Sequence, residues 1–340
     1  TKDGKIDHDE IIHEISQLTG ISIEQLSQKQ ATNLKTLEEK MKLQVFGQDK
    51  AINTITDKIL VARAGLKSLN KPVGSFLFLG PTGCGKTETA RQLAKTLGVE
   101  LLRFDMSEYQ EKHSIAKLIG SPPGYVGYED TTMGGGMFIN EVEKNPHAVV
   151  LFDEVEKAHR DVSNMLLQVM DYGTVTGSNG KKADCRNITL IMTSNLGAEH
   201  FNDPKGDIKN KIKQVIQNSF RPEFINRIDD IIAFNKLDDE NLRVITMNQL
   251  KLLSKRIYED IGIETIFDSS VINHISNIGD NQIYGARPIK RKIQTQIENE
   301  LSKLIISDEV IKGGSYNISI SDGKLVSTIN QKQLQSNPSS

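Results

Sequence analysis

The chain has 340 residues, of which 37% are hydrophobic and 25% charged, and its formal net charge at neutral pH is −2. This is the composition of a globular protein long enough for two domains. The balanced charge argues against a nucleic-acid surface, and no apolar run reaches the roughly 18–20 residues of a membrane-spanning helix. The first residues form no signal peptide and include no initiator Met, so we expect a piece of a longer intracellular chain with reduced cysteines.

Residues 1–40 are predicted to form a helical linker segment. Apolar residues recur at helical spacing between residues 7 and 19, and Gly20 would end this helix. The sequence VFGQ at 45–48 then precedes a helical stretch that runs to Ala62. Taken alone, Val45 and Phe46 indicate a packed turn, and nothing in this part of the chain points to catalysis.

Residues 75–87, SFLFLGPTGCGKT, join a short apolar run to a glycine-rich loop with the spacing G-x-x-x-x-G-K-[ST]. Glycines allow positive φ and a close backbone approach to an anion, the lysine reaches phosphates, and the threonine ligates Mg²⁺. A glycine-rich turn with an exposed lysine is the alternative, but the strand and helix that flank the loop favour a nucleotide site. The residues expected to contact the nucleotide are Gly80, Pro81, Thr82, Gly83, Cys84, Gly85, Lys86 and Thr87.

Short apolar runs alternate with helical segments through the predicted large domain, residues 41–235. The predicted strands are 75–80, 99–105, 148–153, 188–193 and 230–234. This alternation is typical of an α/β fold with a doubly wound, parallel, five-stranded sheet. Ligands of such sheets bind at the carboxyl ends of the strands, so residues that follow a strand are the first candidates for function.

Two strand ends carry polar residues suited to phosphate chemistry. VVLFDE at 149–154 is the pattern called Walker B, in which Asp153 would hold Mg²⁺ through water and Glu154 would polarise the attacking water. Asn195 follows another strand and could hydrogen-bond the γ-phosphate or that water. The alternatives are surface acids at a helix start and an Asn that caps a turn. A phosphate loop one βα unit earlier favours catalysis.

The predicted large domain also contains two glycine-containing loops. In GSPPGYVGYED, Tyr125 and Val126 stand between two glycines, and the aromatic side chain is either exposed on a mobile tip or folded onto the domain. Considered without further context, the residues favour the folded-back Tyr. GSNGKKAD at 177–184 contains an Asn-Gly turn signal that is typical of a solvated hairpin.

The alternation of strands and helices stops after Asp230, and residues 236–330 are predicted to form a smaller helical domain. This domain would end in a β-hairpin that turns at Asp322-Gly323, and residues 331–340 would be a disordered tail. Arg227 and Arg287 lie on either side of the predicted boundary between the two domains. Taken alone, an arginine at either position would usually belong to a weak surface ion pair.

The chain contains five motifs in this order, namely GPTGCGKT, VVLFDE, TSN, FRPEFINRID and GAR. The chain resembles the AAA+ ATPases, because these are five of their motifs in the same order. GSPPGYVGYED, LLRFDMSEY and DEVEKAH are similar to the second ATPase ring of Clp-type unfoldases. VFGQDKAI, ARAGL and KPVGSFLFLGPTG look most like the ClpA members, with ClpB and ClpC members close behind. The resemblance covers essentially residues 1–330.

This resemblance implies roles in ATP binding and hydrolysis. Lys86 and Thr87 would bind phosphate and Mg²⁺, Asp153 and Glu154 would be the Walker B pair, and Asn195 would be sensor 1. The implied ligands are ATP or ADP and Mg²⁺.

The resemblance also implies roles outside the phosphate loop. Arg227 matches the arginine finger that enters a neighbouring subunit's site, and Arg287 matches sensor 2. The Val45-Phe46 segment matches the residues around adenine, and the Tyr125-Val126 segment matches the pore loop that grips an unfolded polypeptide. This reverses the preference for a folded-back Tyr125.

The implied protein is an ATP-driven unfoldase that threads unfolded or tagged protein substrates through a homo-hexameric pore, in the cytoplasm or in an organelle matrix or stroma of bacterial descent. A ClpP-type protease would degrade the threaded chains. The alternatives are a free-standing disaggregase of the ClpB type and an AAA+ nucleotide switch that moves no protein. Neither a nucleic acid nor a membrane is an expected partner.

Two features depart from the pattern of the family. Members that feed ClpP carry an aliphatic-Gly-hydrophobic tripeptide on a loop between sensor 1 and the arginine finger, and no such tripeptide is evident between Leu196 and Asn218. Leu196-Gly197-Ala198 matches it poorly and lies too close to Asn195. The other feature is TTMGGG at 131–136, which is longer and richer in glycine than the usual segment after the pore loop.

Overall fold

The computed structural model describes residues 34, 36–120, 135–202, 208–277, 284–307, 313–321 and 323–329. The chain divides into two compact units, one comprising Thr1–Gly80 and Gly85–Phe234 and the other Pro81–Cys84 and Asn235–Ser340. The linker helix expected at 7–19, the Tyr125-Val126 pore loop and the tail 331–340 lie outside the described residues.

The first unit is built on a parallel five-stranded sheet, as the alternating pattern predicts. Its order is β2-β3-β6-β1-β7, and every neighbouring pair is parallel. All residues of β1 and β6 are buried, which explains why these strands are continuous apolar runs rather than alternating ones. The strands are β1 (Gly74–Leu79), β2 (Leu101–Asp105), β3 (Val149–Asp153), β6 (Thr189–Ser194) and β7 (Asp230–Ala233).

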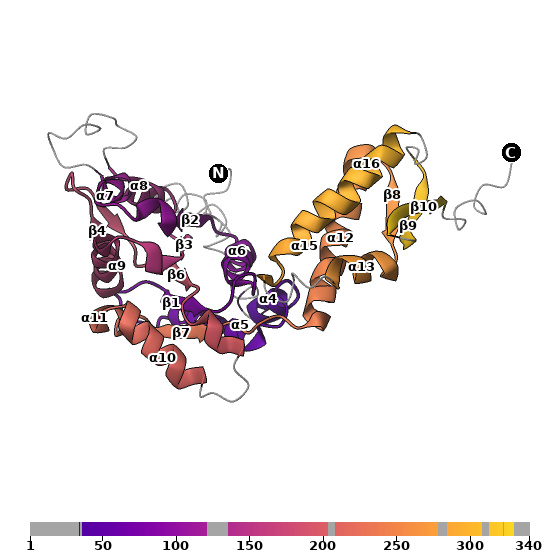
Figure 1. The fold of residues 1–340 in the computed structure, drawn as a ribbon. Coiled ribbons are helices and arrows are strands. Elements are labelled where there is room, and N and C mark those ends of the chain that lie inside the picture. The colour runs from indigo at the N-terminus through magenta and orange to yellow at the C-terminus, as the bar shows by residue number, and fades with distance from the viewer. Residues whose placement is uncertain are drawn as a thin grey trace, which may run out of the picture. The chain divides into compact units, whose positions relative to one another are not determined.

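Helices cover both faces of this sheet, because successive residues of each strand point to opposite sides. α5 (Asp49–Arg63) and α6 (Lys86–Leu97) contact the strands on one face. On the other face, the side chains of α8 (Met137–Lys144), α9 (Arg160–Tyr172) and α10 (Ile208–Ser219) share one core with alternate strand residues such as Leu77, Val150 and Leu190. Figure 1 shows α6 and α9 on opposite sides of the strands.

Shorter elements connect these layers. A two-stranded antiparallel hairpin forms around the Asn-Gly turn. Gly136, directly before α8, has φ +79°. A Cβ at Gly136 would lie 2.3 Å from the carbonyl oxygen of Leu118, so the backbone leaves no room for a side chain there. The elements are α4 (Leu37–Lys42), η1 (Met106–Tyr109), η2 (Lys112–Ser114), α7 (Ile115–Ile119), η3 (Val155–Lys157), β4 (Thr174–Thr176), β5 (Lys182–Asp184), η4 (Ala198–Asn202) and α11 (Pro222–Ile225).

Both cysteines are buried, and neither forms a disulfide. Cys185 follows β5 and is wholly inaccessible, and this burial raises the pKa of its thiol to about 12. The thiol therefore stays protonated at neutral pH and packs as a small apolar group.

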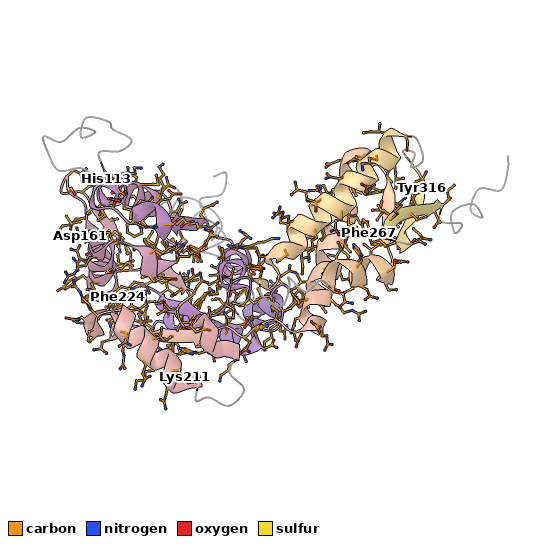
Figure 2. The ribbon with its side chains drawn as sticks, in the orientation of Figure 1. His113, Asp161, Lys211, Phe224, Phe267 and Tyr316 are labelled. Atoms are coloured by element: carbon orange, nitrogen blue, oxygen red, sulfur yellow. The ribbon has the colours of Figure 1, made fainter. Side chains whose placement is uncertain are left out.

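The second unit is mainly helical and ends in an antiparallel hairpin, in agreement with the sequence pattern. The pattern did not indicate β8, which pairs with β9 in parallel and extends the hairpin to three strands. Tyr316 of β9 is buried in the core of this unit, and Phe267 packs against that core (Figure 2). The elements are α12 (Asp239–Ile261), β8 (Glu264–Phe267), α13 (Ser269–Ser276), α15 (Arg287–Lys292), the π-helical η5 (Ile293–Glu298), α16 (Asn299–Ile306), β9 (Ser315–Ser321) and β10 (Lys324–Ile329).

In the part of the chain that the structure describes, no helix has the length and apolar character needed to cross a bilayer.

Three phenylalanines fill the core under β2 and β3. The ring centroids of Phe104 and Phe152 are 5.4 Å apart, and Phe138 of α8 lies 5.7 Å from each. We expect Phe138→Ala to lower the free energy of unfolding of the first unit by about 3–5 kcal/mol, because it removes a fully buried ring and leaves a cavity. Urea unfolding followed by circular dichroism would measure this change.

The matched control is Leu69→Ala, since Leu69 is 82% exposed. Its effect should stay within about 0.5 kcal/mol. Equal losses for the two variants would contradict the assignment of Phe138 to the core.

Candidate functional site

The glycine-rich loop has the backbone that phosphate binding requires. Gly83 and Gly85 have φ values of +75° and +106°, which side chains other than glycine adopt rarely. Gly85 is the N-cap of α6, and Lys86 is the first residue of the helix. The loop therefore delivers backbone N–H groups and the positive end of a helix dipole to one place.

Lys86 is a buried side chain with two oxygen partners from different parts of the fold. Its Nζ donates to the carbonyl oxygen of Gly80 at 2.5 Å and to Oδ1 of Asn195 at 3.0 Å. The ammonium group is thus held between the end of β1 and the residue that follows β6. A buried lysine needs such partners, because desolvation of an unpaired charge would be costly.

Asp153 ends β3 and faces the start of α6. The Thr87 hydroxyl lies 3.5 Å from Oδ1 and 3.4 Å from Oδ2 of this carboxylate. The Thr193 hydroxyl donates to Oδ1, and the Arg103 guanidinium donates to Oδ2 at 2.7 Å. The carboxylate is thereby fixed in one orientation from three sides.

Glu154 occupies a strained position directly after β3. Its φ of +58° is the one positive value found for a residue other than glycine in the described part of the chain. Oε1 accepts from Nδ2 of Asn195 at 3.1 Å, and Oε2 pairs with Nζ of Lys157 at 2.5 Å. Its backbone N–H donates to the Thr193 hydroxyl at 3.1 Å. Backbone strain of this kind costs about 1–3 kcal/mol and concentrates at functional sites.

Asn195 joins these groups. Its Oδ1 accepts from Lys86, its Nδ2 donates to Glu154, and its backbone N–H donates to Oε1 of Glu156 at 3.0 Å. One amide side chain therefore connects the phosphate-loop lysine to the acidic pair after β3. The structure brings together five of the predicted residues, namely Lys86, Thr87, Asp153, Glu154 and Asn195.

The other predicted residues lie in different surroundings. Arg227 follows α11 and pairs through Nε with Oδ1 of Asp171 at 2.6 Å. Arg287 is exposed at the start of α15 in the second unit. Val45 is buried and Phe46 partly buried just before α5. The roles of these residues remain predictions, and Tyr125 lies outside the described residues.

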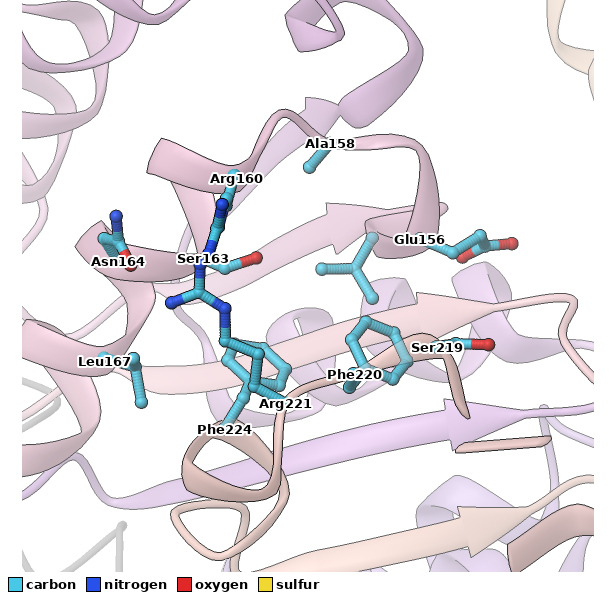
Figure 3. A pocket seen from close by; sticks show the side chains of 11 residues that line it. Glu156, Ala158, Arg160, Ser163, Asn164, Leu167, Ser219, Phe220, Arg221 and Phe224 are labelled. Atoms are coloured by element: carbon cyan, nitrogen blue, oxygen red, sulfur yellow. The ribbon is translucent and has the colours of Figure 1, made fainter. Parts of the chain in front are cut away.

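A separate pocket of about 220 Å³ lies between the start of α9 and the α10–α11 junction (Figure 3). Phe220 and Phe224 stack with their centroids 5.4 Å apart, and Arg221 and Glu156 also line the pocket. Glu156 links this pocket to the group described above, because its Oε1 accepts from the N–H of Asn195. The pocket contains no predicted phosphate-binding residue.

Sequence reasoning missed three residues of this group. Arg103 is a charged residue between the apolar Leu102 and Phe104 of β2, and this was the available signal. Thr193 looks like any strand threonine, and only the pairing of β3 with β6 brings it beside Asp153. Lys157 lies three residues after Glu154, a spacing that allows contact within one helical turn.

Comparison with known families gives two adjoining matches. Residues 71–231 match the model of an AAA domain (Cdc48 subfamily), and residues 237–318 match the C-terminal, D2-small domain of ClpB protein. The chain belongs to the Clp-type AAA+ ATPases. The two matches, in this order, correspond to the second ATPase domain of a Clp-type chain.

Curated relatives of this Clp-type domain carry the name chaperone protein ClpB. The one from Rickettsia conorii is 42% identical over 93% of this chain and 37% of its own length. ClpB 1 from Thermosynechococcus vestitus is 40% identical over 94% of this chain and 37% of its own length. The chain thus spans little more than a third of the length of these relatives.

A solved structure gives the same result. The chain is similar to a closed-state cryo-EM reconstruction of Hsp104 with ATPγS and FITC casein, with a TM-score of 0.83 and 35% identity. The match covers 95% of this chain and 56% of that chain. It confirms the predicted AAA+ fold with a smaller C-terminal domain. These relatives are of the ClpB and Hsp104 type, whereas the sequence motifs looked most like the ClpA members.

Thr193 offers a test of this geometry. Thr193→Val removes the hydroxyl that joins Asp153 to the N–H of Glu154, so we expect the ATPase rate to fall by about 10–100-fold, the usual effect of losing a group that orients a ligand. Thr193→Ser, which keeps the hydroxyl, should restore most of the rate. A steady-state phosphate-release assay would measure both variants.

The matched control is Thr246→Val, which removes another buried hydroxyl, one that donates to the carbonyl of Leu242 at 2.8 Å inside α12. It should cost comparable stability and leave the ATPase rate near that of the unmodified protein. An unchanged rate in Thr193→Val would show that this hydroxyl does not position the acidic pair.

Proposed function

We propose that this domain hydrolyses ATP to drive the unfolding and threading of protein substrates in a ClpB-type disaggregase. The observation that carries the proposal is the Asn195 side chain, which contacts both Lys86 and Glu154. These are the groups expected to hold the terminal phosphate and to activate water. A residue that touches both can couple the presence of that phosphate to the position of the catalytic carboxylate.

The proposed chemistry assigns one task to each residue. The N–H groups at the start of α6 and the Lys86 ammonium bind the β- and γ-phosphates and neutralise charge that builds up during transfer. Glu154 accepts a hydrogen bond from the attacking water and so orients and polarises it. Its second oxygen stays paired with Lys157, which keeps the carboxylate from rotating.

Thr87 and Asp153 fit a Mg²⁺ ion. A hydroxyl and a carboxylate within 3.5 Å of each other supply hard oxygen ligands, and Mg²⁺ characteristically takes one or two such ligands and shares phosphate oxygens. When bound, the ion would supply charge neutralisation on the phosphates. The chain's own part is to hold Asp153 ready through Thr193 and Arg103.

The remaining roles concern the assembled protein. Arg227 would reach a phosphate held by a neighbouring copy, which requires a ring, in this family a hexamer. Arg287 would sense the phosphates from the second unit, and the Val45-Phe46 segment would pack around adenine. Loss of γ-phosphate contacts would change the arrangement of these parts and so move the Tyr125 loop, which grips the substrate.

A disaggregase of the ClpB type fits better than delivery to a ClpP-type protease, which the sequence first suggested. The curated relatives are ClpB chaperones, and the Hsp104 reconstruction contains FITC casein. No aliphatic-Gly-hydrophobic docking tripeptide is evident between Asn195 and Asn218. These points support a protein that releases its threaded chains rather than one that feeds ClpP.

Two substitutions separate binding from hydrolysis. Lys86→Ala should abolish nucleotide binding, because it removes the cation from the phosphate site. Glu154→Gln should bind ATP with near-normal affinity yet hydrolyse it at least about 100-fold more slowly, since an amide polarises water poorly. Fluorescent-nucleotide titration and phosphate release would measure the two properties. Normal turnover in Glu154→Gln would refute the role of the carboxylate.

Tyr125→Ala tests the threading role. We expect it to keep the ATPase rate within about twofold while unfolding of a tagged fluorescent substrate is lost, because the aromatic side chain supplies steric grip and no chemistry. The loss of fluorescence of the substrate would be followed in the whole protein. Undiminished unfolding would rule out the grip, and a nucleotide switch that moves no protein would predict no unfolding by either form.

A further inference from the structure

Asp171 is the partner that the structure gives to Arg227. The carboxylate Oδ1 lies 2.6 Å from Nε of the guanidinium, with the Asp171 side chain 24% exposed and that of Arg227 47% exposed. The two residues come from different parts of the first unit, Asp171 from α9 and Arg227 from the turn between α11 and β7. The contact therefore ties that turn to a helix of the core.

The position of Asp171 is unfavourable for the helix that carries it. It lies next to the last residue of α9, where the helix dipole is negative and an anion is destabilising, and no basic residue occupies that last turn. Arg227 brings a positive charge from outside to this helix end. A residue that is locally unfavourable, such as an anion at the negative end of a helix, and that is stabilised by one specific partner is a candidate for a functional role.

The atoms used in the contact decide what Arg227 can still do. The shortest contact of the pair is made by Nε, on the inner side of the guanidinium, whereas the fork that recognises phosphate is formed by the two terminal amino groups. We propose that Asp171 is a positioning residue, which anchors Arg227 by Nε so that the terminal fork is presented to the phosphates of ATP bound by a second copy of this chain. This inference rests on the proposed role of Arg227 between subunits.

Stability alone does not account for the pair, since a partly exposed ion pair contributes at most about 1 kcal/mol. Orientation has a larger effect. A displacement of about 1 Å in a positioned group can cost about 100-fold in rate, and an arginine finger contributes about 10³–10⁵. Loss of the anchor should therefore affect hydrolysis far more than folding.

A mixing experiment tests the proposal, because the effect must appear in the neighbouring subunit. Donor subunits carry Glu154→Gln, so they supply Arg227 but scarcely hydrolyse ATP. Acceptor subunits carry Arg227→Ala, so they keep an intact site but supply no arginine. Each alone is expected to be nearly inactive, and rings mixed from the whole protein should regain activity in acceptor sites that face a donor.

Asp171→Asn is then placed in one population at a time. In the donor it should lower the regained rate by about ten- to a hundredfold, whereas in the acceptor, which has no Arg227 to anchor, the regained rate should be kept. Asp171→Glu in the donor retains the carboxylate and should restore part of the rate. Binding of a fluorescent nucleotide by the donors shows that each variant is folded.

The matched control is Glu298→Gln in the donor. Glu298 pairs with Arg256 at 2.7 Å in the second unit, with exposed fractions of 33% and 57%, so the same kind of bond is broken elsewhere. The regained rate should not change. If donors with Asp171→Asn regain the same ATPase rate as donors that carry Glu154→Gln alone, the positioning role of Asp171 is overturned and the role of Arg227 survives. If the parent mixture regains no activity, both are overturned.

Discussion

The hydrogen bonds of one amide hold this site together. Asn195 accepts from Lys86 and donates to Glu154, and the Glu154 carboxylate is completed by Lys157. Without these bonds, the buried Lys86 ammonium would keep fewer partners, among them the carbonyl oxygen of Gly80, and the Glu154 carboxylate would no longer be held in one orientation. The chain therefore places the groups proposed to bind phosphate and to activate water in one hydrogen-bonded network, so that a displacement of one group would alter the hydrogen bonds of the other.

The parallel sheet makes this network possible. β1, β3 and β6 run in the same direction, so their carboxyl ends deliver the phosphate loop, the acidic pair and Asn195 to a single edge. The register places Phe152 opposite Met192, and the next residues along, Asp153 and Thr193, meet through a hydrogen bond. A shift of this register by one residue would turn the Thr193 hydroxyl away from the carboxylate.

The sequence was sufficient to predict elements with strong local signals. Buried strands are continuous apolar runs, the glycine spacing requires a particular loop, and polar residues after strands must share an edge. Arg103, Thr193 and Asp171 could not be assigned in this way, because their roles come from partners 50, 40 and 56 residues distant along the chain. The pairing of β8 with β9 was missed for the same reason, since the strand has only four residues and its partner follows α13, α15, η5 and α16.

The left-handed backbone of Glu154 has a consequence for how this fold can change. A glycine or an asparagine would adopt that conformation with less strain, so the folded state would gain from losing the glutamate. Selection for thermal stability alone would favour those residues and would remove the carboxylate that is proposed to activate water. At this turn, selection for thermal stability and selection for the proposed ATPase activity would therefore favour different residues.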